Sequence, residues 1–218
     1  MRHITLSFVV VVAGGLWAQA GFSLKPHKVT VEQREGVAYV KASGGDPDQF
    51  GLVAGSENFK NGVIELELSG KPSVGAVGGA RGFVGVAFRV AADKSRFECF
   101  YLRPTNGRAD DQVRRNHASQ YISFPDYPWE RSRKETPEKY EAYVDLAPGE
   151  WTKVRIVVDG LQARLYVHSN AQPTLLVNDL KHGAEAWGAV ALWVGPGTEA
   201  RFRNVEIRPL AGGTARVP

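Results

Sequence analysis

The chain has 218 residues, of which 43% are hydrophobic and 23% are charged, and its formal net charge is +4. The hydrophobic content is that of a folded globular protein and argues against a disordered chain. So small a net charge argues against a dedicated nucleic-acid-binding protein, which concentrates basic residues on one face.

The first twenty residues have the layout of a secretory signal peptide. A short basic start precedes an apolar stretch over residues 4–16, and an Ala-Gln-Ala cleavage motif ends at Ala20. The apolar stretch is too short to span a bilayer, and no second stretch of spanning length follows. We therefore expect cleavage after Ala20 and a secreted or periplasmic protein with no membrane span.

The remaining chain is expected to form one domain over residues 21–210, followed by a disordered tail over residues 211–218. No low-complexity linker divides the interior. Its single cysteine, Cys99, cannot form an internal disulfide and lies between aromatic residues in RFECFYL. We interpret Cys99 as a small buried side chain rather than a nucleophile.

Turn residues recur at short intervals and helical periodicity is nearly absent, which is typical of an all-β sandwich or barrel. The expected strands are Val29–Gln33, Val37–Ala42, Gly62–Ser69, Gly82–Val90, Ser95–Arg103, Glu141–Asp145, Trp151–Asp159, Gln162–His168, Leu175–Leu180, Ala186–Val194 and Arg201–Arg208. Asp159-Gly160 predicts a tight hairpin turn. We interpret the last two strands, joined by Gly-Pro-Gly, as the pair that closes the sandwich.

Two of these strands carry candidate site residues. One face of the strand at 82–90 carries Phe83, Gly85, Ala87 and Arg89. Small side chains on this face indicate a surface kept open for a ligand or a covering loop. In the next strand, alternation places Glu98 on the opposite face from Tyr101 and Arg103. The pattern leaves open which of these two faces meets a groove.

The segment from residue 103 to 140 is too long for an ordinary connection, and such segments usually carry function or are disordered. Its many aromatic residues argue against disorder, so we expect an ordered loop packed over a sheet. Planar Arg, Asn and Gln groups beside aromatic rings are suited to sugar recognition. The expected ligand-binding residues are Arg89, Tyr101, Arg103, Asn106, Arg114, Asn116, His117, Gln120, Tyr121 and Trp129.

Other interpretations of this segment remain open. Its arginines could instead pair with Asp110, Asp111, Glu130 and Glu135 and simply hold the loop in place. His117 is a candidate general base because the ordinary pKa of histidine lies near neutrality, and Glu98 is a second catalytic candidate. The histidines and acids show no metal-binding spacing, although Asp110 and Asp111 could form a calcium site. We expect no cofactor.

Several segments together resemble the concanavalin A-like lectin/glucanase superfamily. They are FKNGVIELEL, GFVGVAFRV, the RPTN…QY segment, GEWTKVRIVVDGLQARLYV and GTEARFRNVEI. Within it they are similar to laminin-G-like and 3-keto-disaccharide hydrolase modules of secreted bacterial proteins. The resemblance covers most of residues 28–208 and implies a jelly-roll sandwich of two antiparallel sheets. The Glu-x-Asp-x-x-Glu strand of laminarinase-type enzymes is incomplete, since Glu67 holds the middle position and no third acid follows.

Three functions are compatible with these features. The first is an exported, lectin-like domain that binds a carbohydrate in a groove covered by the 103–140 loop. The second is a glycoside-processing hydrolase, which needs two ionisable groups flanking one cleft. The third is an adhesion or protein-interaction module, which would present a flat patch with an apolar centre. The sequence does not indicate the ligand or the oligomeric state.

Overall fold

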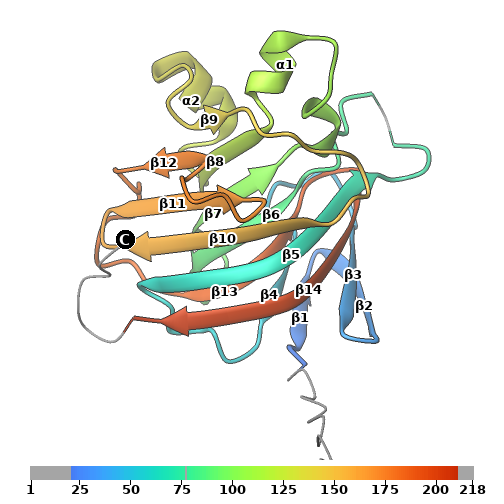
Figure 1. The fold of residues 1–218 in the computed structure, drawn as a ribbon. Helices are drawn as coiled ribbons and strands as arrows, with labels where there is room; N and C mark the ends of the chain where they lie inside the picture. The colour runs from blue at the N-terminus through green and yellow to red at the C-terminus, as the bar shows by residue number, and fades with distance from the viewer. Residues whose placement is uncertain (1–20, 77, 211–218) are drawn as a thin grey trace, which may run out of the picture.

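The computed structural model describes residues 21–76 and 78–210, which form two antiparallel sheets packed face to face (Figure 1). The expected signal peptide and C-terminal tail lie outside the described residues. Within them, no helix is long and apolar enough to cross a membrane. The two packed sheets confirm the all-β sandwich that the sequence predicts.

The first sheet, sheet A, has seven strands in the order β1-β4-β13-β6-β7-β8-β9. Their bounds are β1 Leu24–His27, β4 Phe50–Val53, β6 Val84–Val90, β7 Phe97–Leu102, β8 Ser119–Phe124, β9 Glu141–Ala142 and β13 Ala189–Val194. Three short helical segments accompany this sheet: η1 Pro104–Asn106, α1 Gln112–Asn116 and α2 Trp129–Glu135. Figure 1 shows α1 and α2 at one end of the molecule, beside β8 and β9.

The second sheet, sheet B, also has seven strands, in the order β12-β11-β10-β5-β14-β3-β2. Their bounds are β2 Val29–Arg34, β3 Val37–Ala42, β5 Gly62–Pro72, β10 Thr152–Asp159, β11 Gln162–Val167, β12 Leu175–Val177 and β14 Thr198–Pro209. The chain alternates between the sheets at β4, β5 and β6, and again at β13 and β14. Such crossings build a jelly roll.

The two sheets differ in how their faces are buried. In sheet B, β5 alternates buried and partly buried residues, as expected for a sheet with one face on the core and one toward water. In sheet A, every residue of β6, β7 and β13 is buried. A second apolar cluster on the outer face of sheet A, separate from the core between the sheets, accounts for this difference. Much of the outer face of sheet A is therefore covered.

The structure corrects three expectations about the strands. The strands at 186–194 and 201–208 exist but do not pair, because β13 belongs to sheet A and β14 to sheet B. The segment from 103 to 140 is not only a loop: it contains β8, which pairs with both β7 and β9. Finally, β1 and β4 were not predicted, since both are short and contain Pro or Gly.

Candidate functional site

A row of side chains crosses the outer face of sheet A. Successive register partners in this row are His27, Phe50, Trp193, Gly85, Tyr101, Gln120 and Glu141. Residues directly opposite each other in a sheet share a face, so these side chains lie side by side.

Gly85 gives the row its shape. A Cβ at Gly85 would lie 2.2 Å from the Phe100 carbonyl oxygen and 2.6 Å from the Tyr101 Cβ, so no larger residue fits. The rings of Tyr101 and Trp193, on the strands to either side, approach to 4.9 Å between centroids. The bare glycine thus allows two aromatic rings to meet over the middle strand.

These rings form part of the floor of a groove with a volume of about 640 Å³. The lining is mostly aromatic and proline side chains: Phe83, Tyr101, Ile122, Phe124, Trp193, Pro47, Pro125, Pro128, Trp129 and Pro196, with Gly45 and Glu130. Trp129, the first residue of α2, is 39% exposed, more than any other aromatic side chain of the lining. The volume is within the range of small-ligand pockets.

The floor is held rigidly. The Trp193 indole donates a hydrogen bond of 2.7 Å to the Pro47 carbonyl oxygen and so ties the loop that contains Gly45 to the sheet. Phe97 stacks on Phe124 with 4.9 Å between ring centroids. A groove held in this way needs little ordering when a ligand enters.

A buried polar network lies beside the groove, under α2. Arg103 donates to the Tyr101 hydroxyl at 2.7 Å, to Gln120 Oε1 at 3.0 Å and to Glu141 Oε1 at 3.2 Å. Arg133 donates to Glu141 Oε2 at 2.9 Å, and its guanidinium lies 4.6 Å from the centre of a Trp129 ring. The Glu141 carboxylate therefore orients, through two arginines, both Tyr101 and Trp129.

Burial shifts the ionisation of this network. It raises the pKa of the Tyr101 phenol, so this hydroxyl is neutral at physiological pH. It lowers the pKa of His117, outweighing the Glu141 carboxylate, whose Oε1 lies 3.5 Å from His117 Nδ1. It also lowers the pKa of Arg103, although the ordinary pKa of arginine is high enough for the guanidinium to stay charged.

Six of the ten expected ligand-binding residues fall into three groups. Tyr101 and Trp129 line the groove. Arg103 and Gln120 are buried beneath α2, and Gln120 lies 3.5 Å from Ser132 of that helix. Asn106 and His117 help to hold Arg103 in place, because Arg103 and Asn106 both donate hydrogen bonds to the His117 carbonyl oxygen.

The remaining expected residues lie elsewhere. Arg114 and Asn116 belong to α1, where no residue is buried. Tyr121 faces the core between the sheets and donates its hydroxyl hydrogen bond to Glu98, which is fully buried. Glu98 therefore faces the interior, while Tyr101 faces the groove, which answers the question that the alternation left open.

Arg89 is also separated from the groove. It adopts a positive φ of 53° and donates to the carbonyl oxygens of Lys60, Gly160 and Gly183 and to Asn61 Oδ1, at 2.9–3.1 Å. All of these acceptors belong to loops, so the geometry gives Arg89 a structural role in joining them.

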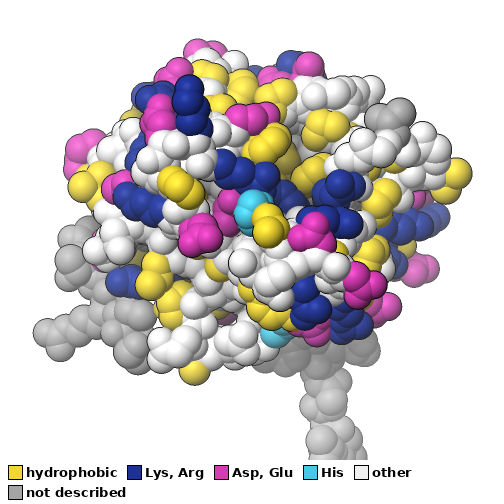
Figure 2. All heavy atoms as spheres, turned by 90° about the horizontal axis from the view of Figure 1, so that it is seen from above, with side chains coloured by type: hydrophobic (Ala, Val, Ile, Leu, Met, Phe, Trp, Pro, Cys, Tyr) yellow, Lys and Arg dark blue, Asp and Glu magenta, His cyan; other side chains and the backbone are white. Residues whose placement is uncertain are grey.

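The arginines of the 103–140 segment pair largely with acids. Arg131 pairs with Glu135, as one interpretation of the sequence expected, but Arg108 pairs with Asp145 and Arg133 with Glu141. Figure 2, which views the end that carries α1 and α2, shows basic and acidic side chains intermixed around hydrophobic ones. The segment therefore presents no field of a single sign.

The acids considered for calcium are partly engaged. Asp111 Oδ1 accepts a hydrogen bond of 3.1 Å from the Arg114 amide and caps α1. Among the described residues, no group of three or more His, Cys, Asp or Glu side chains is arranged to hold a metal ion.

Cys99 is buried, and burial raises the pKa of its thiol well above the ordinary value.

Sequence reasoning missed Trp193, Phe124, Glu141 and Arg133 as site residues. Phe83 and Trp193 did carry a signal, because each large ring adjoins two small residues on its strand face, Gly85 and Ala87 for Phe83 and Ala189 and Ala191 for Trp193. Glu141 and Arg133 carried none that distinguishes them from solvated charges.

Comparisons with known proteins agree with this architecture. The family model of the 3-keto-alpha-glucoside-1,2-lyase-like domain matches residues 15–208. Among solved structures, the carbohydrate-binding module CBM66 from Bacillus subtilis has a TM-score of 0.59 at 14% identity and covers 85% of this chain and 94% of its own. No curated protein matches the sequence significantly.

Two further structures are similar. A glycosyl hydrolase-like protein from Parabacteroides distasonis has a TM-score of 0.50 at 13% identity and covers 83% of each chain. A Bacillus subtilis protein of unknown function with a galectin-like fold has a TM-score of 0.50 at 10% identity and covers 86% of this chain and 88% of its own. At such identities the likeness shows a shared fold alone.

Proposed function

The chain belongs to the 3-keto-alpha-glucoside-1,2-lyase-like domain family, and from this premise we propose that it is an exported protein that binds a carbohydrate in the groove on the outer face of sheet A. The observation that carries the proposal is the lining of that groove, where Trp129 stands exposed beside Tyr101 and Trp193. The C–H face of a sugar ring packs well on aromatic faces of this kind.

Directed hydrogen bonds would complete the recognition. The Glu130 carboxylate at the groove can accept hydrogen bonds from sugar hydroxyls. The Tyr101 hydroxyl accepts a hydrogen bond from the buried Arg103, which fixes the ring on which the sugar would pack. The likeness to the carbohydrate-binding module CBM66 supports a carbohydrate ligand as well.

The same lining favours binding over catalysis. An elimination beside a keto group needs a base that removes a proton and an acid that protonates the leaving oxygen. Among the described residues that line the groove, the ionisable ones are Glu130 and Tyr101, and burial keeps the Tyr101 phenol neutral. Glu98, the earlier catalytic candidate, is fully buried on the other face of the sheet.

Glycoside processing is a second candidate, favoured by the match to a lyase-like domain family. His117, whose side chain is 21% exposed and lies 3.5 Å from Glu141, is the group that would act as base. Incubating the protein with 3-keto and ordinary disaccharides tests this candidate, and product formation that His117→Gln abolishes would establish it.

The binding proposal is tested with an oligosaccharide array and calorimetry on three proteins. The wild type should bind, and Trp129→Ala should weaken binding about tenfold, the effect of losing about 1.4 kcal/mol of ring contact. Trp187→Ala is the matched control, since Trp187 is 60% exposed and does not line the groove. Equal effects of both substitutions, or a blank array for the wild type, would overturn the proposal.

A further inference from the structure

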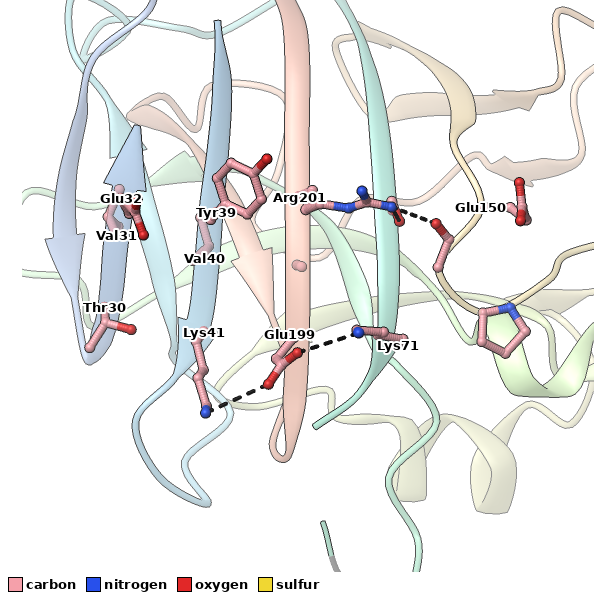
Figure 3. A pocket seen from close by; sticks show the side chains of 14 residues that line it. Thr30, Val31, Glu32, Tyr39, Val40, Lys41, Lys71, Glu150, Glu199 and Arg201 are labelled. Atoms are coloured by element: carbon pink, nitrogen blue, oxygen red, sulfur yellow. Dashed lines mark hydrogen bonds and ion pairs between the residues drawn. The ribbon is translucent and has the colours of Figure 1, made fainter. Parts of the chain in front are cut away.

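A second groove lies on the outer face of sheet B, on the opposite side of the sandwich from the groove described above (Figure 3). Its volume is about 770 Å³, and β2, β3, β5 and β14 form its floor together with residues 148–150. Most of the lining belongs to strands, so its side chains are held at fixed spacing by the sheet.

Two neighbouring rows of side chains project into this groove. In one row, Glu199 of β14 lies between Lys41 of β3 and Lys71 of β5. In the other, Arg201 lies beside Tyr39. Figure 3 shows both lysines converging on Glu199 and the Tyr39 ring standing out from the sheet beside Arg201.

The lysines keep their hydrogen-bonding capacity. Their Nζ atoms lie 3.6 Å and 3.7 Å from the Glu199 carboxylate oxygens, which is longer than a hydrogen bond. Their side chains are 59% and 56% exposed, so the ammonium protons are accessible. Arg201, in contrast, is anchored, because it donates to the Gly149 carbonyl oxygen at 2.6 Å and to Ser69 Oγ at 3.1 Å.

The charges of the lining select the class of ligand. Three basic side chains, Lys41, Lys71 and Arg201, are matched by three acidic ones, Glu32, Glu150 and Glu199. A lining of no net charge attracts neither an anion nor a cation over distance. It nevertheless offers many donors and acceptors around one aromatic ring, that of Tyr39, a combination that suits a neutral polyhydroxylated ligand. The Arg34 guanidinium lies 4.4 Å from the centre of this ring and covers one face, so a sugar would pack on the other face.

We propose that this groove is a second binding site, for a neutral saccharide, in which the Tyr39 ring packs on the sugar while Lys41, Lys71 and Glu199 bond its hydroxyls. The proposal does not depend on the function of the sheet A groove. If both sites bind, one protein can hold two saccharide chains on opposite faces, which increases retention on a polysaccharide without any new contact.

Amide chemical shifts of the full protein test this site directly. The probes are neutral hexasaccharides of glucose, in several linkages, and of fructose, with a uronate hexasaccharide for comparison. At least one neutral probe should shift the amide signals of residues 39, 41, 199 and 201. Tyr39→Ala should weaken that response about tenfold.

Two controls separate this proposal from the sheet A groove. Leu176→Ala, at a 48% exposed position on the far edge of sheet B, should leave the response unchanged. Trp129→Ala, a substitution in the sheet A groove, should also leave it unchanged. Amide shifts confined to sheet B would support this second site and would overturn the function proposed for sheet A. Three results would overturn the second site: no shift of the four amide signals with any neutral probe, a response that Tyr39→Ala leaves unchanged, or stronger binding of the uronate.

Discussion

Replacing Glu141 by glutamine should destabilise the protein and weaken ligand binding together. The Glu141 side chain is 4% exposed and faces Arg103, which is 6% exposed, and Arg133, which is 32% exposed. Removing one partner of a buried ion pair costs about 3–5 kcal/mol because it leaves a charge buried without its counter-charge. Glutamine keeps one acceptor oxygen, so we expect the lower end, about 3 kcal/mol.

Thermal unfolding measures this effect. For a protein of this size, about 3 kcal/mol corresponds to a loss in Tm of roughly 6–12 °C. The matched control is Glu65→Gln, which removes a carboxylate paired with Arg208, a side chain that is 52% exposed. An exposed pair contributes at most about 1 kcal/mol, so the control should lose no more than about 4 °C. Equal losses in the two variants would refute the reasoning that burial makes the Glu141 network strong.

Gly85→Ala should lower both Tm and saccharide affinity, because a Cβ at this position would lie 2.2 Å from a backbone oxygen, whereas Gly44→Ala, with no atom within 4 Å of its Cβ, should change neither. Burial lowers the pKa of His182, so as the pH falls the unfolded chain takes up a proton before the folded protein does. Tm should therefore fall as the pH decreases through about 6.5. His182→Gln should flatten this dependence of Tm on pH, and an unchanged dependence would contradict the assignment to His182. Cys99 should resist a thiol reagent until the protein unfolds. Adding calcium or EDTA should leave Tm and affinity unchanged, and a shift with calcium would reveal a metal site.

The strands could be predicted where local pattern decides them. Val37–Ala42 was predicted with its observed bounds. The expected hairpin between β10 and β11 forms, although its two turn residues are Gly160, at a positive φ of 56°, and Leu161 rather than Asp159 and Gly160. β8 escaped detection because it is buried on both faces and so lacks alternation, and polar residues flank it. A strand of this kind is recognisable only from its neighbours in the sheet.

The site could be predicted only in part, for a related reason. Composition identified Tyr101 and Trp129, which line the groove. Composition could not predict that Trp193 lies next to Tyr101, because this contact depends on the strand order β13-β6-β7 and on Gly85, which has no side chain, between the two rings. It also could not tell that Arg103 binds Glu141 rather than a ligand, because charge patterns do not specify partners across strands.

The central claim is that a saccharide binds over the aromatic floor of sheet A. The indole N–H signals of the tryptophans test it in one titration, because Trp129 and Trp193 line the groove while Trp187 lies outside it. With an oligosaccharide that the array identifies, the account predicts saturable shifts of the Trp129 and Trp193 signals and an unmoved Trp187 signal. Saturable binding that leaves both groove signals unchanged would contradict it.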